Sequence, residues 1–268
     1  MDKKNYSTMG TFGDTIYSLC LMKLQGGGNL YVKLDALDPF FRNVLGWPNG
    51  AGEAAGRLTQ RDYDIMEPLL KAQDYLHEVA VWNGQEIDED FIDHWKMHIP
   101  KGWQGNQTEC YALVAKPKLN IFDANIRKQL LHEPWLTPVD PIKIPGKPIV
   151  VNRTSRHLHG ADGSGWNDFI KNGLPDYGVF IGTEKEHAVF EESLKIKIQY
   201  HKTEDLLEAA RVIQGCEQFI GNQSSALSIA IGLGKTYWCE LRADWEQTKT
   251  PHDGYGDTWF PRINGFYF

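Results

Sequence analysis

The chain has 268 residues, a length that fits one large domain or two compact ones. Hydrophobic residues make up 41% and charged residues 24%, values of an ordinary globular protein that exclude collagen-like, disordered and coiled-coil classes. The net charge of −7 argues against a broad surface for nucleic acid or anionic membrane. Because the sequence has neither a membrane-spanning apolar run nor the apolar core of a secretory signal, we expect a cytoplasmic protein without integral membrane contact.

The first half of the sequence predicts an α/β layer. The expected elements are a helix over 15–25, a strand over 30–37, a helix over 65–73, a strand over 75–82, an acidic turn with a short helix over 84–95, and a helix over 124–136. The acidic residues 88–90 are expected to begin that short helix. Residues 46–61 are rich in glycine and lack periodicity, which predicts a functional loop. No two of the four cysteines are spaced as CxxC, so we expect reduced, mostly buried thiols.

Five prolines in residues 133–148 predict a linker, because each proline ring disfavours helix and favours extended chain. Beyond it the expected elements are strands over 147–153, 177–183, 195–200, 216–221 and 235–241, and helices over 166–173, 184–193, 203–215 and 224–234. Thr203 is the predicted N-cap of the third of these helices. Such alternation predicts a doubly wound parallel sheet that binds ligands at the carboxyl ends of its strands. Two such layers around a linker would enclose a cleft.

The first candidate turn is GTFGDTI at residues 10–16. Its glycines allow a tight turn, and Asp14 stands where the following helix begins. A carboxylate at this position either caps the helix and complements its dipole or faces the cleft as a general base. Sequence alone leaves both interpretations open.

The second candidate turn follows the strand over 147–153 and contains Arg153 and Arg156. Two arginines three residues apart at the carboxyl end of a strand can grip phosphate oxygens, although surface arginines are common. The neighbouring His157 and His159 lack carboxylate or thiolate partners at metal-ligand spacing, so we expect no metal.

The third candidate turn joins the strand over 216–221 to the helix over 224–234. Its residues are Gly221, Asn222, Gln223, Ser224 and Ser225. Free amides and hydroxyls at the start of a helix suit a diphosphate, while the simpler interpretation is an N-cap by one of the serines. The turn is neither GxGxxG nor a P-loop, so dehydrogenase and kinase interpretations lose support.

Together these turns resemble the family 9 glycosyltransferases, the ADP-heptose:lipopolysaccharide heptosyltransferase type. The matching pieces, in order, are residues 13–19, Trp166, and residues 179–186, 205–207, 219–225 and 230–235. The resemblance implies an α/β, GT-B-like fold of two Rossmann-like domains whose parallel sheets face a central cleft. Residues 1–140 would form the acceptor-side domain and residues 141–268 the nucleotide-sugar-binding domain.

The resemblance also implies a reaction and roles for individual residues. A sugar would pass from a nucleotide-sugar to an acceptor hydroxyl by metal-independent, inverting displacement, with no cofactor required. Asp14 would be the catalytic base, with Gly13 and Thr15 beside it on the acceptor side. Arg153, Arg156 and the turn at 221–225 would hold the donor diphosphate, and Glu240 would bind a ribose or be a surface glutamate. Gln223 stands where the family has an acidic residue, so ADP-heptose is not assumed as the donor.

Two questions stay open in the sequence. The acceptor is a saccharide or a hydroxylated base in DNA, as in phage-type DNA modification, with the loop over 46–61 holding the flipped base. The net charge of −7 counts against DNA. From a different class, the chain is a catalytically silent nucleotide- or sugar-binding module of the same fold.

Overall fold

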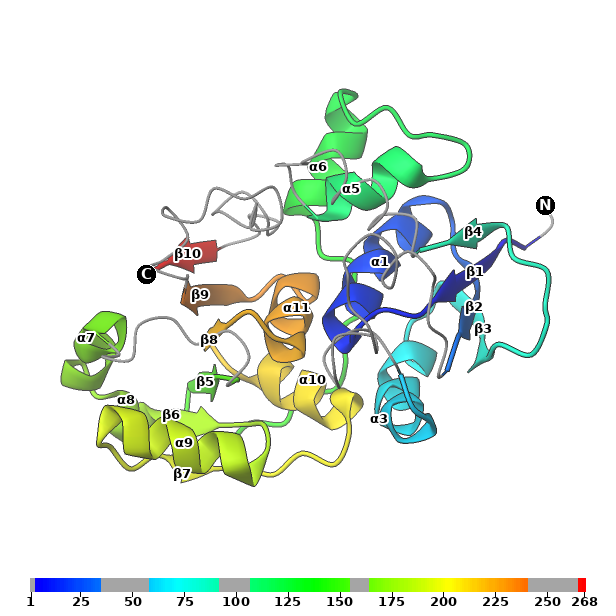
Figure 1. The fold of residues 1–268 in the computed structure, drawn as a ribbon. Helices are drawn as coiled ribbons and strands as arrows, with labels where there is room; N and C mark the ends of the chain where they lie inside the picture. Colours follow the sequence, from blue (N-terminus) through cyan, green and yellow to red (C-terminus); the bar gives the residue numbers. More distant parts are fainter. Residues whose placement is uncertain (1–2, 35–57, 92–106, 155–163, 241–264) are drawn as a thin grey trace, which may run out of the picture.

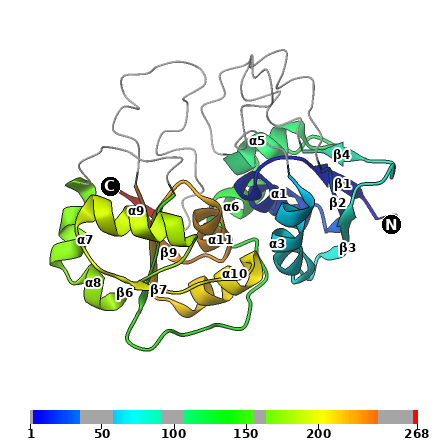
Figure 2. The same cartoon turned by 60° about the horizontal axis from the view of Figure 1, so that its bottom comes forward.

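A computed structural model describes residues 3–34, 58–91, 107–154, 164–240 and 265–268. Within these residues the strands form two separate sheets, of four and six strands, in which all pairs are parallel. Helices α1 and α11 lie side by side between the two sheets, as both views show (Figures 1 and 2). The predicted α/β class with two parallel sheets is therefore confirmed.

The first sheet has the strand order β3-β2-β1-β4. Its elements are β1 (Asn5–Thr8), α1 (Phe12–Leu24), β2 (Gly28–Val32), α3 (Gln60–Lys71), β3 (Leu76–Val81) and β4 (Glu89–Asp90), followed by α5 (Gln107–Val114) and α6 (Ala124–His132). Helices α5 and α6 pack against α1 and against each other.

The second sheet has the order β10-β9-β8-β5-β6-β7. Its strands are β5 (Ile149–Asn152), β6 (Gly178–Phe180), β7 (Gln199–Tyr200), β8 (Gln218–Asn222), β9 (Thr236–Glu240) and β10 (Gly265–Tyr267). The connecting helices are a 3₁₀ turn (Ser164–Trp166), α7 (Asn167–Lys171), α8 (Leu174–Tyr177), α9 (Glu184–Leu194), α10 (Leu206–Gly215) and α11 (Ser225–Gly232). Because β8 lies between β5 and β9, the carboxyl ends of these three strands meet at one edge.

The acidic stretch over 88–90 is a correction to the sequence prediction, because Glu89 and Asp90 form strand β4 and do not begin a helix. Each carboxylate pairs with a lysine of the first layer: Glu89 with Lys4 at 2.6 Å, and Asp90 with Lys33 at 2.5 Å. These ion pairs hold the segment against β1, where local sequence could not place it.

Smaller corrections concern the ends of elements. Asp205, not Thr203, caps α10, and its Oδ1 accepts the N–H of Glu208 at 2.8 Å. The predicted strand over 195–200 is reduced to β7, and α6 ends before Pro134, whose ring disfavours helix in the residue before it. Strand β1 and helix α5 were not predicted. Residues 46–57 of the predicted loop lie outside the described residues, and its last residues open α3.

The proline-rich segment joins the two halves and also locks them together. The backbone N–H groups of Trp135 and Leu136 donate to the carbonyl of Gly232, at 3.0 and 2.9 Å, and the indole N–H of Trp135 donates to the carbonyl of Ile16 at 2.9 Å. One apolar cluster continues from the first layer, through α1 and α11, into the second. The division at 140/141 stays a prediction, because packing joins the halves across it.

All four cysteines are free and buried, as predicted. Among the helices in the described ranges, none is long and apolar enough to cross a membrane.

Candidate functional site

Asp14 stands in the first turn of α1, just after the carboxyl end of β1. Its Oδ2 accepts the backbone N–H of Thr11 at 2.9 Å and the hydroxyl of Thr11 at 2.8 Å, which forms a capping box. Gly10 is needed for this arrangement, because a Cβ there would lie 2.7 Å from the Cβ of Asp14. Asp14 therefore does cap the helix, as the simpler interpretation held. Its other oxygen decides whether it can do more.

Helix α5 brings two further side chains to Asp14, which sequence reasoning missed. The amide Nε2 of Gln107 donates to Asp14 Oδ1 at 3.2 Å, and the hydroxyl of Tyr111 donates to the Asp14 carbonyl at 2.8 Å. Burial, and then the charge of Asp14, raise the pKa of Tyr111 well above its usual range, so the phenol stays protonated and remains a donor. Gln107 lies 93 positions after Asp14 in the sequence, and no local sequence pattern marks it as a partner of Asp14.

The two predicted neighbours of Asp14 have different surroundings. A Cβ on Gly13 would lie 4.0 Å from the hydroxyl of Ser228, so the Asp14 turn directly faces the first turns of α11. Thr15 is fully buried, and its hydroxyl lies 3.2 Å from that of Thr8 on β1. The acceptor-side roles of both residues stay predictions.

The turn before α11 divides into a structural part and a half-buried part. A Cβ on Gly221 would lie 2.3 Å from the carbonyl oxygen of Asn152, so β5 leaves no room for a side chain. Asn222 is buried and bridges to Thr154: its Oδ1 accepts the Thr154 N–H at 2.9 Å and its Nδ2 donates to the Thr154 carbonyl at 2.8 Å. These two residues therefore join β8 to β5.

Gln223, Ser224 and Ser225 are half-buried at the N-terminus of α11. The hydroxyl oxygen of Ser224 accepts the N–H of Leu227 at 3.2 Å, so Ser224 is the N-cap that the simpler interpretation expected. The donor-binding role of this turn stays a prediction.

Arg153 and Glu240, both predicted to contact the donor, bind each other. Arg153 Nε and Nη2 donate to the two carboxylate oxygens of Glu240 at 2.7 and 2.6 Å, and the two side chains are only 4% and 6% exposed. Nη1 reaches Ser193 at 3.3 Å, and the guanidinium lies 5.8 Å from the centre of the Trp166 ring. The expectation of a surface glutamate is wrong, because the pair spans the end of β8 inside the protein.

This pair also changes how Arg153 can act. The Nε and Nη2 edge of its guanidinium group is occupied by Glu240, so this edge is not open to a phosphate. The donor-binding roles of Arg153 and Glu240 stay predictions, and Arg156 lies outside the described residues.

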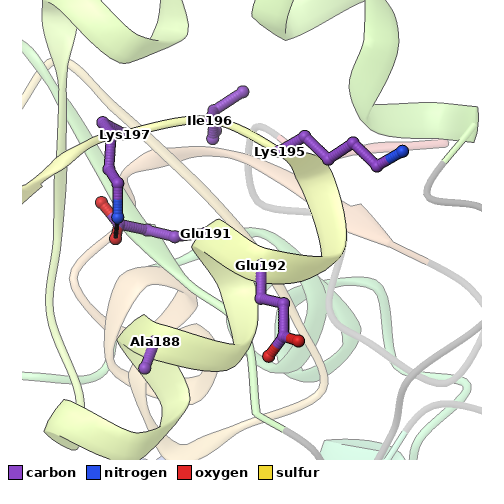
Figure 3. Close-up of a pocket in the computed structure, with 6 residues that line it drawn as sticks. All are labelled: Ala188, Glu191, Glu192, Lys195, Ile196 and Lys197. Carbon is purple, nitrogen blue, oxygen red and sulfur yellow. Dashed lines mark hydrogen bonds and ion pairs between the residues drawn. The ribbon is translucent and has the colours of Figure 1, made fainter.

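A separate cavity of about 480 Å³ lies at the end of α9 (Figure 3). Its lining residues are Ala188, Glu191, Glu192, Lys195, Ile196 and Lys197. Lys197 pairs with Glu191 at 2.6 Å, and Glu191 also accepts the N–H of Ile198. None of the predicted site residues lines this cavity. In the part of the chain that the structure describes, no group of three or more His, Cys, Asp or Glu side chains is placed to hold a metal ion.

Comparison with known proteins gives matches in structure only. The sequence significantly matches no protein-family model and no curated protein. A family 9 glycosyl transferase from Veillonella parvula DSM 2008 superposes with a TM-score of 0.58 at 11% identity, covering 100% of this chain and 88% of that one. The E. coli heptosyltransferase WaaC with ADP gives a TM-score of 0.49 at 13% identity, over 98% and 93% of the two chains. The structure therefore confirms, at the level of the fold, the resemblance to family 9 glycosyltransferases that the sequence motifs indicate.

Proposed function

We propose that this protein is a glycosyltransferase that moves a sugar from a nucleotide-sugar donor to an acceptor hydroxyl. The observation that carries the proposal is the position of Asp14, whose turn faces the first turns of α11 across the boundary between two parallel-sheet layers. The fold shared with a family 9 glycosyl transferase supports this interpretation of the position. Fold alone would not, because one fold hosts many functions.

In the proposed reaction Asp14 removes the proton of the acceptor hydroxyl as its oxygen attacks the anomeric carbon. The bond to the nucleoside diphosphate breaks, and its electron pair leaves on the phosphate oxygen. Direct displacement of this kind inverts the anomeric centre. The first backbone amides of α11 and the side chains at 223–225 are our candidates for stabilising the leaving diphosphate. Arg156 is the proposed cationic partner, because Arg153 is engaged by Glu240.

The experiment that tests the proposal is a thermal-shift screen against nucleoside diphosphates and their sugars, followed by a transfer assay with the best donor. We expect a diphosphate and its sugar to raise the melting temperature and a plain nucleoside to do so less. Transfer should persist in EDTA. Donor binding with neither transfer to any acceptor nor hydrolysis of the donor would favour a catalytically silent module.

The acceptor class is tested with the same donor. Saccharides and DNA that carries hydroxymethylated nucleobases are tested as acceptors separately, because both would present a hydroxyl group to the proposed catalytic base, Asp14. We propose a saccharide, since the net charge of −7 disfavours a polyanion. Product formation on DNA alone would reverse this assignment.

A further inference from the structure

The two oxygens of the Asp14 carboxylate have unequal surroundings. Oδ2 accepts two hydrogen bonds from Thr11, at 2.9 and 2.8 Å, whereas Oδ1 accepts one longer bond of 3.2 Å from Gln107. A carboxylate oxygen offers about two lone pairs, so with the donors that the described residues supply, Oδ2 is filled and Oδ1 keeps one lone pair for a substrate. Oδ1 is thus the oxygen on which a proton can be received.

Gln107 is buried beside Oδ1, on a helix that is tied to Asp14. It is 3% exposed and begins α5, while Tyr111, one turn later on the same helix, donates to the Asp14 carbonyl at 2.8 Å. Thr108, the residue after Gln107, joins α5 to α6 through a buried hydrogen bond of 2.7 Å from its hydroxyl to the Leu130 carbonyl. Helix α5 therefore grips residue 14 at both its carboxylate and its backbone.

We propose that Gln107 is a positioning residue that presents Asp14 Oδ1 to the attacking hydroxyl and is needed in both protonation states of the carboxyl. The inference rests on the proposed function. In the ionised state the Gln107 Nε2–H donates to Oδ1, as observed. When the acceptor O–H bond breaks, its proton passes to Oδ1 and its electron pair forms the new bond to the anomeric carbon. The Gln107 amide then turns, and its Oε1 accepts a hydrogen bond from the new Oδ1–H.

An amide suits this position better than a charged side chain, because it can donate before the transfer and accept after it. A lysine or arginine would donate only and would hold the carboxyl in its ionised form. An aspartate or glutamate would compete with Asp14 for the same proton. Gln107 therefore stabilises the carboxylate without trapping it.

The described elements packed around Asp14 bring these other ionisable groups. Helix α1 itself carries Tyr17, and α5 brings Tyr111, Cys110 and Glu109. Helix α6 brings Arg127, which pairs with Glu109 at 3.3 Å. Strand β1 brings Tyr6, whose hydroxyl donates to Gln25 at 2.7 Å. The facing helix α11, all of which the structure describes, carries no ionisable side chain. In this set the Gln107 amide is the group that donates to Oδ1, and it also hydrogen-bonds the Tyr111 side chain.

The test uses the full-length protein and two readouts. Carbon-13 carboxyl shifts of Asp14, assigned with Asp14→Asn, follow its titration by NMR without substrate, and kcat is measured against pH with the best donor. In Gln107→Leu, loss of a hydrogen-bond donor to the charged form should move both the titration and the acidic limb of kcat to higher pH. The plateau kcat should fall about tenfold, with the KM of the donor unchanged.

Gln107→Glu is the second variant, and it keeps the length of the side chain if the leucine variant folds poorly. Two adjacent carboxyls share one proton, so both readouts should move further than in Gln107→Leu. The matched control is Gln73→Leu, which removes an equally buried glutamine (1% exposed) whose amide donates to the Leu69 carbonyl. It should lower stability but leave the Asp14 titration and the acidic limb in place.

An Asp14 titration that stays at its wild-type pH in both Gln107 variants overturns the inference. So does an acidic limb that does not move in an active variant, or one that moves equally in Gln73→Leu. If the wild-type protein transfers no sugar from any donor, the proposed function fails. The carboxyl titration, which needs no substrate, still decides whether Gln107 controls Asp14.

Discussion

Replacing Asp14 with asparagine separates its two roles, because the chain contains a second capping box of the same geometry. In α3 the Oδ2 of Asp62 accepts the N–H and the hydroxyl of Thr59 at 2.8 and 2.7 Å, against 2.9 and 2.8 Å for Asp14 and Thr11. Of the two, Asp14 has a buried amide on its other oxygen, and its helix packs against α11. Asp62→Asn is therefore a matched control for the helix-capping role.

The expected loss of stability is small and similar in the two variants. Each loses a negative charge at a helix N-terminus, worth about 0.3–1 kcal/mol, and weakens its bonds from threonine. A total of about 1 kcal/mol lowers the melting temperature of a chain this long by about 2–4 °C. In Asp14→Asn the amide oxygen takes the place of Oδ2, because Thr11 offers two donors there. The new NH₂ then meets the Gln107 amide, which must turn.

The activities should differ sharply. Loss of a general base costs about 10²–10⁴ in kcat, so Asp14→Asn should lose at least about a hundredfold while still binding the donor. Asp62→Asn should keep its kcat within about twofold. The assay is steady-state transfer at a temperature where both variants are folded, with donor affinity from the thermal shift. Near-normal turnover in Asp14→Asn would refute the base assignment, and an equal loss in Asp62→Asn would show that capping alone explains the effect.

Three further predictions concern buried contacts. Glu240→Gln leaves the Arg153 charge buried without its anion and should lower the free energy of unfolding in urea by about 3–5 kcal/mol, much of which the double variant with Arg153→Met should recover. A loss below about 1 kcal/mol would contradict a buried pair. Gly232→Ala puts a Cβ 2.7 Å from Leu136 Cγ where the two halves meet, so overpacking should cost about 1–3 kcal/mol by the same measurement, and an unchanged midpoint would show that the linker yields. Burial raises the pKa of Cys216 to about 11, so only about one thiol in a thousand is ionised at pH 8. A disulfide reagent should therefore label Cys216 in the unfolded protein but barely in the native one, and rapid labelling of the native protein would contradict the burial.

Local sequence was sufficient for features that depend on neighbours in the chain. The capping role of Asp14 follows from Thr11 three residues earlier, and that of Ser224 from the strand and apolar helix around it. Helix α11 is predictable because small and apolar residues follow one N-cap without interruption. For the same reason the alternation of the second half gave the parallel sheet and its edge.

Contacts between distant segments were out of reach. Arg153 and Glu240 are 87 positions apart, and each looked like a free ligand because nothing near either residue in the sequence shows the other. The acidic residues of β4 resembled the start of a helix. In the structure they pair with lysines from another part of the layer, which local sequence does not show. Tertiary charge pairing overrode local propensity in both places.

The same limit explains why the candidate base looked ambiguous. As a capping residue Asp14 needs only α1, and by that measure it equals Asp62. What separates them is α5, which places Gln107 on Oδ1 and Tyr111 on the backbone, and the packing of α1 against α11. These contacts depend on the position of α1 between the two layers. The indole N–H of Trp135 in the linker donates to the carbonyl of Ile16 on α1. A helix that joins the halves of the molecule therefore also sets the geometry of its candidate base, so a change at this junction should alter turnover as well as stability.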